Sequence, residues 1–215
     1  VFPARRNRPT PYLWSQADIA RLLDGARALR SPIRAATHQA LFGLLAVSGM
    51  RVGEATGLDR GDIDFETGVV TIRHAKHDRT RLVPLHETAV AALDAYATER
   101  DRLCSAARSD AFFVSSTGTR LTPSGIAKTL RQITTDMGIR NATTAPTAHQ
   151  LRHSFAVRTL MDWQQSGVSI DGKIAILSTY LGHIAPSDPY WYLSASPELM
   201  AMAAERLDTR FGART

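Results

Sequence analysis

Thr147–Phe155, which reads Thr-Ala-His-Gln-Leu-Arg-His-Ser-Phe, is the stretch around which we expect the rest of the chain to be organised. It begins with a typical helix N-cap residue, and the apolar residues that follow, through Leu160, have helical spacing. On that helix His149, Arg152 and His153 are three or four residues apart, so they share one face. Two imidazoles beside a guanidinium suit an anion that is held and then attacked. Phosphate is the natural candidate, because Arg binds it bidentately and His moves protons near neutral pH.

Two simpler interpretations of this helix remain open. Its two histidines, four residues apart, are a possible metal pair, but Gln150 stands where the helix of a zinc protease has its Glu. Because no acidic or Cys cluster lies nearby in the sequence, we expect neither a metal ion nor a cofactor. Alternatively, the polar residues are solvated or packed in the core and carry no chemistry.

The composition is that of a globular protein. The chain has 215 residues, of which 44% are hydrophobic and 21% charged, enough for one sizeable core or two small ones. No apolar run reaches the roughly 18 residues of a membrane span, and the first residues do not resemble a signal peptide. The single cysteine, Cys104, fits a reducing compartment. We therefore expect a cytoplasmic protein that does not contact a membrane.

The charge indicates a nucleic-acid partner. The net charge is +6 and the pI about 10.0. Among 26 basic residues only Lys76, Lys128 and Lys173 are lysines. In a chain that relies so strongly on Arg, each remaining Lys is a candidate for a task that Arg cannot perform.

Helical patterns cover most of the chain, and a short group of β-branched residues interrupts them. The predicted helices span residues 15–26, 31–47, 87–102, 122–137, 147–160, 172–181 and 197–210. The predicted strands are residues 62–64, 69–74 and 81–84, with turns at 66–68 and 76–80. Residues 112–114 are predicted as a short strand or a buried loop. The fold class is therefore mainly α, mixed with a small three-stranded antiparallel sheet.

A second polar position lies in Ser48-Gly-Met-Arg-Val-Gly-Glu, where Arg51 stands between largely apolar segments. A guanidinium in such a place needs a partner, and Glu54 is the nearest one. The pair is either purely structural, or Glu54 holds Arg51 while the guanidinium faces a phosphate. The local sequence leaves both open.

These stretches, taken with three others, closely resemble the tyrosine recombinase (phage integrase) family. The motifs are Arg51 in its Ser-Gly-Met-Arg-Val-Gly-Glu segment, His149-x-x-Arg152-His153, Leu181-Gly-His183, Tyr192 nine residues later, and Lys76 in Ala-Lys-His-Asp-Arg-Thr-Arg-Leu-Val-Pro-Leu. The last resembles the family's catalytic β-hairpin. Each motif alone is weak, but five in order at the family's spacing are specific. The resemblance covers residues 15–205, and it departs from the family at Pro189, where a Thr is common.

The resemblance implies a site-specific DNA recombinase that cleaves and rejoins double-stranded DNA through a 3′-phosphotyrosine intermediate, without metal or ATP. Tyr192 would be the nucleophile, with His149 as the base that helps to remove its proton. Arg51 and Arg152, aided by His183, would hold the non-bridging oxygens of the scissile phosphate.

The remaining roles concern the leaving group and the support of the site. The departing 5′-oxygen needs a proton, which Arg cannot give and Lys can, so Lys76 is the candidate general acid. Glu54 would position Arg51. His153 would support the site or only pack.

The resemblance also implies a domain organisation. Residues 1–12, with Arg5, Arg6 and Arg8, are expected to be a basic, DNA-binding linker that follows an N-terminal core-binding domain absent from this sequence. Residues 13–215 would form the catalytic domain. Its helix at 197–210 would dock on a neighbouring subunit in a tetramer on DNA, or pack on its own domain.

Two other functions use similar residues. A type IB topoisomerase relaxes supercoils with the same chemistry, but the short chain and the Leu-Gly-His turn argue against it. A catalytically inactive DNA-binding accessory protein is the other alternative, and the presence of every expected catalytic residue argues against decay. Neither motif nor charge predicts the DNA site, because base recognition depends on groove contacts.

Overall fold

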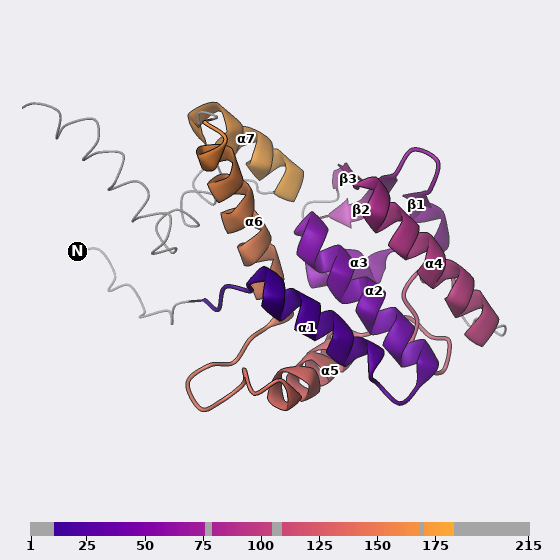
Figure 1. The fold of residues 1–215 in the computed structure, drawn as a ribbon. Coiled ribbons are helices and arrows are strands. Elements are labelled where there is room, and N and C mark those ends of the chain that lie inside the picture. The colour runs from indigo at the N-terminus through magenta and orange to yellow at the C-terminus, as the bar shows by residue number, and fades with distance from the viewer. Residues whose placement is uncertain (1–10, 76–78, 105–108, 168–169, 183–215) are drawn as a thin grey trace, which may run out of the picture.

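The computed structural model describes residues 11–75, 79–104, 109–167 and 170–182. The longer helices are α1 (Gln16–Arg27), α2 (Pro32–Ser48), α4 (Glu87–Leu103), α5 (Pro123–Asp136), α6 (Ala148–Gln165) and α7 (Ile170–Leu181). Between α2 and α4 lie the short helix α3 (Val52–Gly57), a 3-10 turn (Arg60–Asp62) and the strands β1 (Ile63–Asp64), β2 (Val69–Ala75) and β3 (Arg79–Pro84). This mainly helical fold with one small antiparallel sheet confirms the predicted fold class (Figure 1).

Helix α2 is the central helix of the domain and packs against α1, α4 and α6 (Figure 1). It begins with Pro32, which suits the first turn of a helix, and ends at Gly49, whose φ is 61°. A side chain at Gly49 would come within 2.6 Å of Phe155 and 2.8 Å of Leu181. Helices α6 and α7 therefore approach the chain closely at the point where α2 ends and the Arg51 segment begins.

The sheet has the strand order β1-β2-β3, with Val70 opposite Val83 and Ile72 opposite Arg81. Because side chains alternate between the two faces of a strand, these four residues share one face. Val70, Ile72 and Val83 are buried in the core, whereas Leu82, on the other face, is 64% exposed. Arg81 therefore points towards the interior, where a charged side chain needs a partner.

Helix α6 is longer than the predicted 147–160, because the chain continues in helical form to Gln165 and buries Gln164 on the way. Leu151 belongs to the main core. From Ala156 onwards, α6 contributes to a second apolar cluster, which it shares with α7. That cluster consists of Ala156, Val157, Leu160, Ile174, Leu177 and Leu181. It fixes α7 on α6 and so places the end of α7 beside the end of α2.

Two local predictions are refined by the structure. Helix α3 was not predicted, because it is only six residues long and buries only Ala55 and Thr56, too few for a helical pattern. Residues 112–114 are buried but make only isolated bridges within the described chain, as Val114 does with Arg120, so they form a buried loop.

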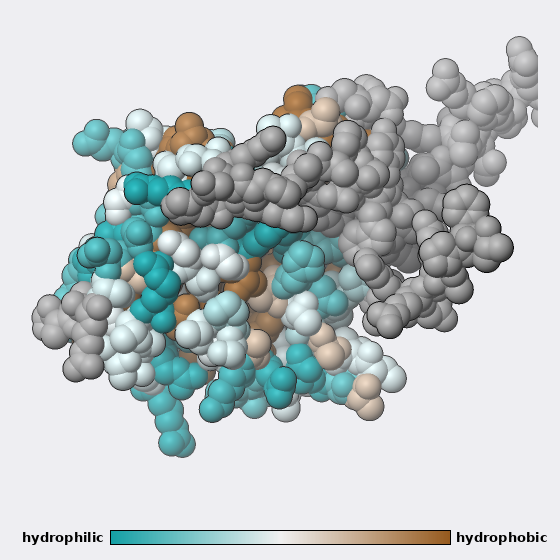
Figure 2. Space-filling view, turned by 180° about the vertical axis from the view of Figure 1, so that it is seen from behind, coloured by the Kyte–Doolittle hydropathy of each residue, from teal (hydrophilic) through white to brown (hydrophobic). Residues whose placement is uncertain are grey.

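Apolar residues gather mainly inside the molecule. Seen from behind, the described surface is mostly hydrophilic, with hydrophobic residues in small separate patches (Figure 2). Among the helices that the structure describes, none combines the length and apolar character needed to cross a membrane.

Candidate active site

Glu54 forms the centre of a hydrogen-bonded cluster at the start of α3. Its Oε2 accepts a hydrogen bond from the backbone N–H of Arg51 at 2.8 Å, and its Oε1 accepts one from Arg51 Nη1 at 2.7 Å. The Glu54 side chain is 8% exposed and that of Arg51 is 32% exposed. The carboxylate thus holds the guanidinium from the inside while part of it remains open to solvent.

A second arginine, Arg81, binds the same carboxylate from β3. Its Nη1 donates to Glu54 Oε1 at 2.9 Å and its Nη2 to Oε2 at 2.8 Å. Burial alone would raise the pKa of the Glu54 carboxyl, but the hydrogen bonds from Arg81 and from Arg51 hold that pKa below its usual value. Arg81 was not among the site residues predicted from the sequence. Its position in the predicted strand could have revealed it. Arg81 lies two residues before the apolar Val83, so both side chains are on the same, inward face.

Arg152 reaches the same region from α6, and only 2% of it is exposed. Its Nη1 donates to the carbonyl of Gly49 at 2.7 Å and its Nη2 to the carbonyl of Leu181 at 2.7 Å. Arg51 Nη2 donates to the next carbonyl, that of Gly182, at 3.0 Å. Both candidate phosphate-binding arginines therefore converge on the turn that ends α7, directly before position 183.

The two histidines of α6 differ in exposure. His149 remains solvent-exposed, yet the protein beside its ring lowers the pKa of the imidazole by desolvation, and the charges of Arg152 and Arg51 lower it further. His149 is therefore uncharged at neutral pH and can accept a proton. His153 is 2% exposed, and burial, with a smaller contribution from His149, lowers its pKa to about 4. It cannot contribute positive charge to a phosphate site at neutral pH.

The structure brings together Arg51, Glu54, His149 and Arg152, which are far apart in the sequence, and it places His153 on the inner side of α6. The other candidates lie outside the described residues; they are Arg5, Arg6, Arg8, Lys76, His183 and Tyr192, and with them Pro189. Ala75 pairs with Arg79, so position 76 follows directly on a paired strand.

The charge of this cluster suits an anion. Two guanidiniums, of Arg51 and Arg81, bind the carboxylate of Glu54, and the third, of Arg152, is held by the carbonyl of Leu181 at the turn that ends α7. Together these four side chains carry two positive charges in excess. Across the described ranges, no three His, Cys, Asp or Glu side chains are grouped closely enough to hold a metal ion. An anion with several oxygens, such as a phosphate, is the ligand that donors of this kind bind best.

Comparisons with known proteins point to one family. Residues 14–195 match the model of the phage integrase family. The chain is 42% identical over 223 residues to "Putative integrase/recombinase y4rB" of Sinorhizobium fredii, a match that covers 100% of this chain and 71% of that protein. The crystal structure of XerA recombinase is similar with a TM-score of 0.73 at 26% identity, covering 97% of this chain and 66% of XerA.

A further crystal structure is similar in fold. It is the XerH site-specific recombinase bound to palindromic difH substrate, with a TM-score of 0.68 at 24% identity, and the match covers 91% of this chain and 53% of XerH. The chain thus spans about half to about 70% of the length of these proteins.

Proposed function

Because this chain belongs to the phage integrase family, as its motifs predicted, we propose that it is the catalytic part of a site-specific DNA recombinase. It cuts and rejoins double-stranded DNA through a 3′-phosphotyrosine intermediate. The observation that carries the proposal is the convergence of Arg51 and Arg152 on the turn after α7, with an uncharged His149 beside them. The DNA-bound structure of XerH, a protein of the same fold, supports DNA as the substrate.

The proposed reaction begins at one phosphodiester. The oxygen of Tyr192 attacks phosphorus and forms the new P–O bond, while the bond to the 5′-oxygen breaks. His149 accepts the phenol proton. It is able to do so because its lowered pKa keeps the ring unprotonated at neutral pH. Lys76 gives a proton to the departing oxygen.

The arginines stabilise the charge that develops on the non-bridging oxygens. Phosphoryl transfer leaves the protein mainly with positioning and charge stabilisation, and Arg51 and Arg152 supply both. His183 adds a donor to the same oxygens. In the sequence it directly follows Gly182, whose carbonyl accepts a hydrogen bond from Arg51.

The test is to trap the covalent intermediate. Duplexes enriched from a random pool by binding to the protein are incubated with it, and the reaction is stopped with denaturant. We expect a protein–DNA adduct, attached to Tyr192 by peptide mapping, and none with Tyr192→Phe, which should still bind the duplex. An adduct on Tyr190, or one that survives Tyr192→Phe, would overturn the assignment. Binding without any adduct would instead favour the inactive accessory protein.

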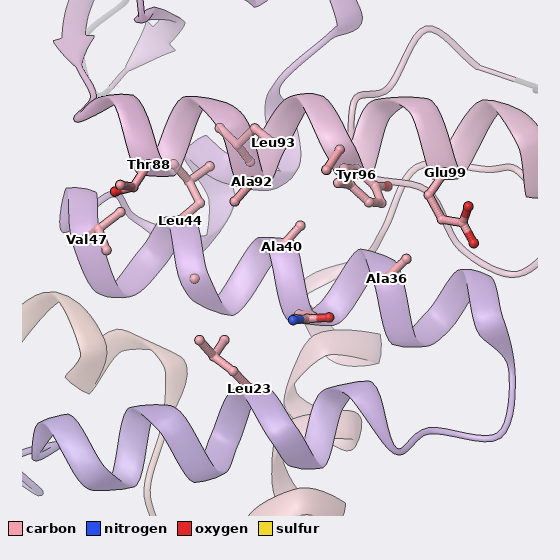
Figure 3. Close-up of a pocket in the computed structure, with 14 residues that line it drawn as sticks. Leu23, Ala36, Ala40, Leu44, Val47, Thr88, Ala92, Leu93, Tyr96 and Glu99 are labelled. Carbon is pink, nitrogen blue, oxygen red and sulfur yellow. The ribbon is translucent and has the colours of Figure 1, made fainter.

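We also propose that copies of the chain associate on DNA through residues 197–210. This segment carries Leu199, Met202 and Leu207 at helical spacing. A candidate acceptor is the cavity of about 470 Å³ between α2 and α4, into which Leu23 of α1 also points (Figure 3). Its lining is largely apolar and includes Ala40, Leu44, Val47, Ala92, Leu93 and Tyr96.

Val47, which is 51% exposed, gives access to this cavity without disturbing the core. Val47→Glu should prevent assembly of more than one copy on a DNA site, measured by sedimentation, and leave binding of the first copy intact. The same loss is expected from Leu199→Glu. If both variants assemble as the parent does, residues 197–210 do not join subunits through this cavity.

A further inference from the structure

Two arginines bind the Glu54 carboxylate, and they do so with different groups. Arg81 binds it with both Nη atoms, at 2.9 and 2.8 Å, in the bidentate geometry that an Arg–carboxylate pair prefers. Arg51 reaches it with only one Nη atom, at 2.7 Å, and with its backbone N–H. The other Nη of Arg51 donates to the Gly182 carbonyl instead. The residue proposed to bind phosphate is therefore not the one that takes the bidentate position.

The two arginines also differ in how far their side chains are exposed to solvent. The Arg81 side chain is 13% exposed and that of Arg51 is 32% exposed, so Arg51 is the guanidinium that an incoming phosphate can reach. A Cβ at Gly182 would overlap Arg81 Nη1, so Arg81 also lies directly against the turn that holds Arg51. Arg81 thus contacts both groups that fix Arg51, the carboxylate and the turn.

The charges explain what this arrangement does. Arg51 and Arg81 with Glu54 together carry one excess positive charge. Without Arg81, Arg51 and Glu54 would form a neutral pair. The carboxylate, having lost both bonds from Arg81, would be free to take both Nη atoms of Arg51, which is the geometry that such pairs prefer. In a largely buried place this neutralisation would matter, because charges there are poorly screened.

On this basis, and resting on the proposed function, we infer that Arg81 is a positioning residue for DNA cleavage: by binding Glu54 bidentately, it keeps the charge and one Nη of Arg51 available to the scissile phosphate. The alternative is that Arg81 only ties β3 to α3. The two differ in how cleavage responds to the charge of the substrate.

The test compares two duplexes, one with an ordinary phosphodiester and one with a methylphosphonate at the scissile position. The methylphosphonate lacks the negative charge that Arg51 stabilises. Arg81→Met should slow single-turnover cleavage of the phosphodiester roughly 10- to 100-fold, the loss expected for one charge-assisted hydrogen bond. On the methylphosphonate, the defect should be clearly smaller. Equal defects on both duplexes would overturn the inference.

Three further variants separate positioning from folding. Arg81→Lys keeps the charge but loses the bidentate geometry, so its ratio between the two duplexes should lie between those of the parent and of Arg81→Met. Glu54→Gln added to Arg81→Met removes the surplus carboxylate charge and should recover part of the phosphodiester rate. A double variant slower than Arg81→Met would contradict this. The matched control is Arg120→Met, which removes a structural arginine bound to Asp59 and should leave the ratio unchanged.

A measurement without turnover distinguishes failure of this inference from failure of the proposed function. The Nε–H signal of Arg51 is titrated with inorganic phosphate by NMR. Arg81→Met should raise the phosphate concentration needed for half-saturation, whereas unchanged binding would overturn the role of Arg81. Absence of a DNA adduct with the parent protein would overturn the recombinase proposal alone, because this titration needs no reaction.

Discussion

Replacing His153 with Gln should make the protein less sensitive to acid. His153 is 2% exposed, and burial, helped by the nearby His149, lowers its pKa from 6.5 to about 4. In the unfolded chain the imidazole regains its ordinary pKa, so between about pH 6.5 and 4 the unfolded state binds more protons than the folded state. The free energy of unfolding therefore falls as the pH falls through this range, and the contribution of His153 is fully present only above it.

The size of the effect follows from the two pKa values. A gap of about 2.5 units corresponds to at most about 3.5 kcal/mol, at roughly 1.4 kcal/mol per unit. Solvent around the exposed His149 reduces the part that arises from charge repulsion. Between pH 7 and pH 5 we therefore expect His153 to account for a loss of about 1–2 kcal/mol.

The assay is urea unfolding at pH 7, 6 and 5, followed by circular dichroism. The parent should lose about 1–2 kcal/mol more than His153→Gln over this range. His38 is also buried, which lowers its pKa as well, but its loss is common to both proteins and cancels in the difference. His86→Asn is the matched control at an exposed histidine that caps α4, and it should behave as the parent. Parallel pH dependences for the parent and His153→Gln would refute the reasoning.

Three further outcomes are expected. Lys76→Ala should cleave an ordinary phosphodiester roughly 10²–10⁴-fold more slowly than the parent. It should cleave a duplex with sulfur at the 5′-bridging position at nearly the parent rate, because a thiolate leaves without a proton. Equal defects on the two duplexes would rule out the acid role. Gly182→Ala should lower the free energy of unfolding, measured in urea, by about 1–3 kcal/mol and should slow cleavage. The reasons are that φ at this residue is 68° and that the new Cβ overlaps Arg81. Full activity would show that the contact with Arg81 is dispensable. Leu160→Ala should lower the free energy of unfolding by roughly 2–5 kcal/mol. It should also increase hydrogen exchange in α7, because Leu160 shares an apolar cluster with that helix. Unchanged exchange would contradict that packing.

The elements with a regular pattern could be predicted from the sequence. The helix after Thr147 begins where its capping pattern indicated, and the backbone N–H of Thr147 donates to the Gln150 side chain at 2.7 Å. Ser15 and Asp18 form a capping box at the start of α1, where the sequence predicted a helix from residue 15. These signals are local, because a cap and its partner lie within one turn of the same helix.

The partners in the site could be predicted only where they are local. Glu54 lies three residues from Arg51, and the sequence suggested that pair. Arg81 binds the same carboxylate from 27 residues away, across a sheet and a helix, and nothing in the spacing connects them. The sequence left open whether the pair was structural or held Arg51 towards a phosphate. The geometry is compatible with both at once, because Glu54 is buried and Arg51 is partly open.

Arg152 illustrates the same limit. The sequence placed it on one helical face with His149, but in the structure Arg152 is buried while His149 is exposed. Its guanidinium binds carbonyls of Gly49 and Leu181, which are 103 and 29 residues away. Those carbonyls are available because they lie at the ends of α2 and α7, where no further turn of helix supplies a donor. Only the packing of three helices brings these ends together.

Helix ends also explain how arginines can be fixed here without losing their charge. A backbone carbonyl at the C-terminal end of a helix carries a partial negative charge, so it attracts a guanidinium but does not neutralise it. Arg152 is held by two such carbonyls and Arg51 by a third, that of Gly182. The only full negative charge in the cluster as described belongs to Glu54, and Arg81 offsets it. The fold thereby orders Arg51 and Arg152 while preserving the positive charge that a scissile phosphate requires.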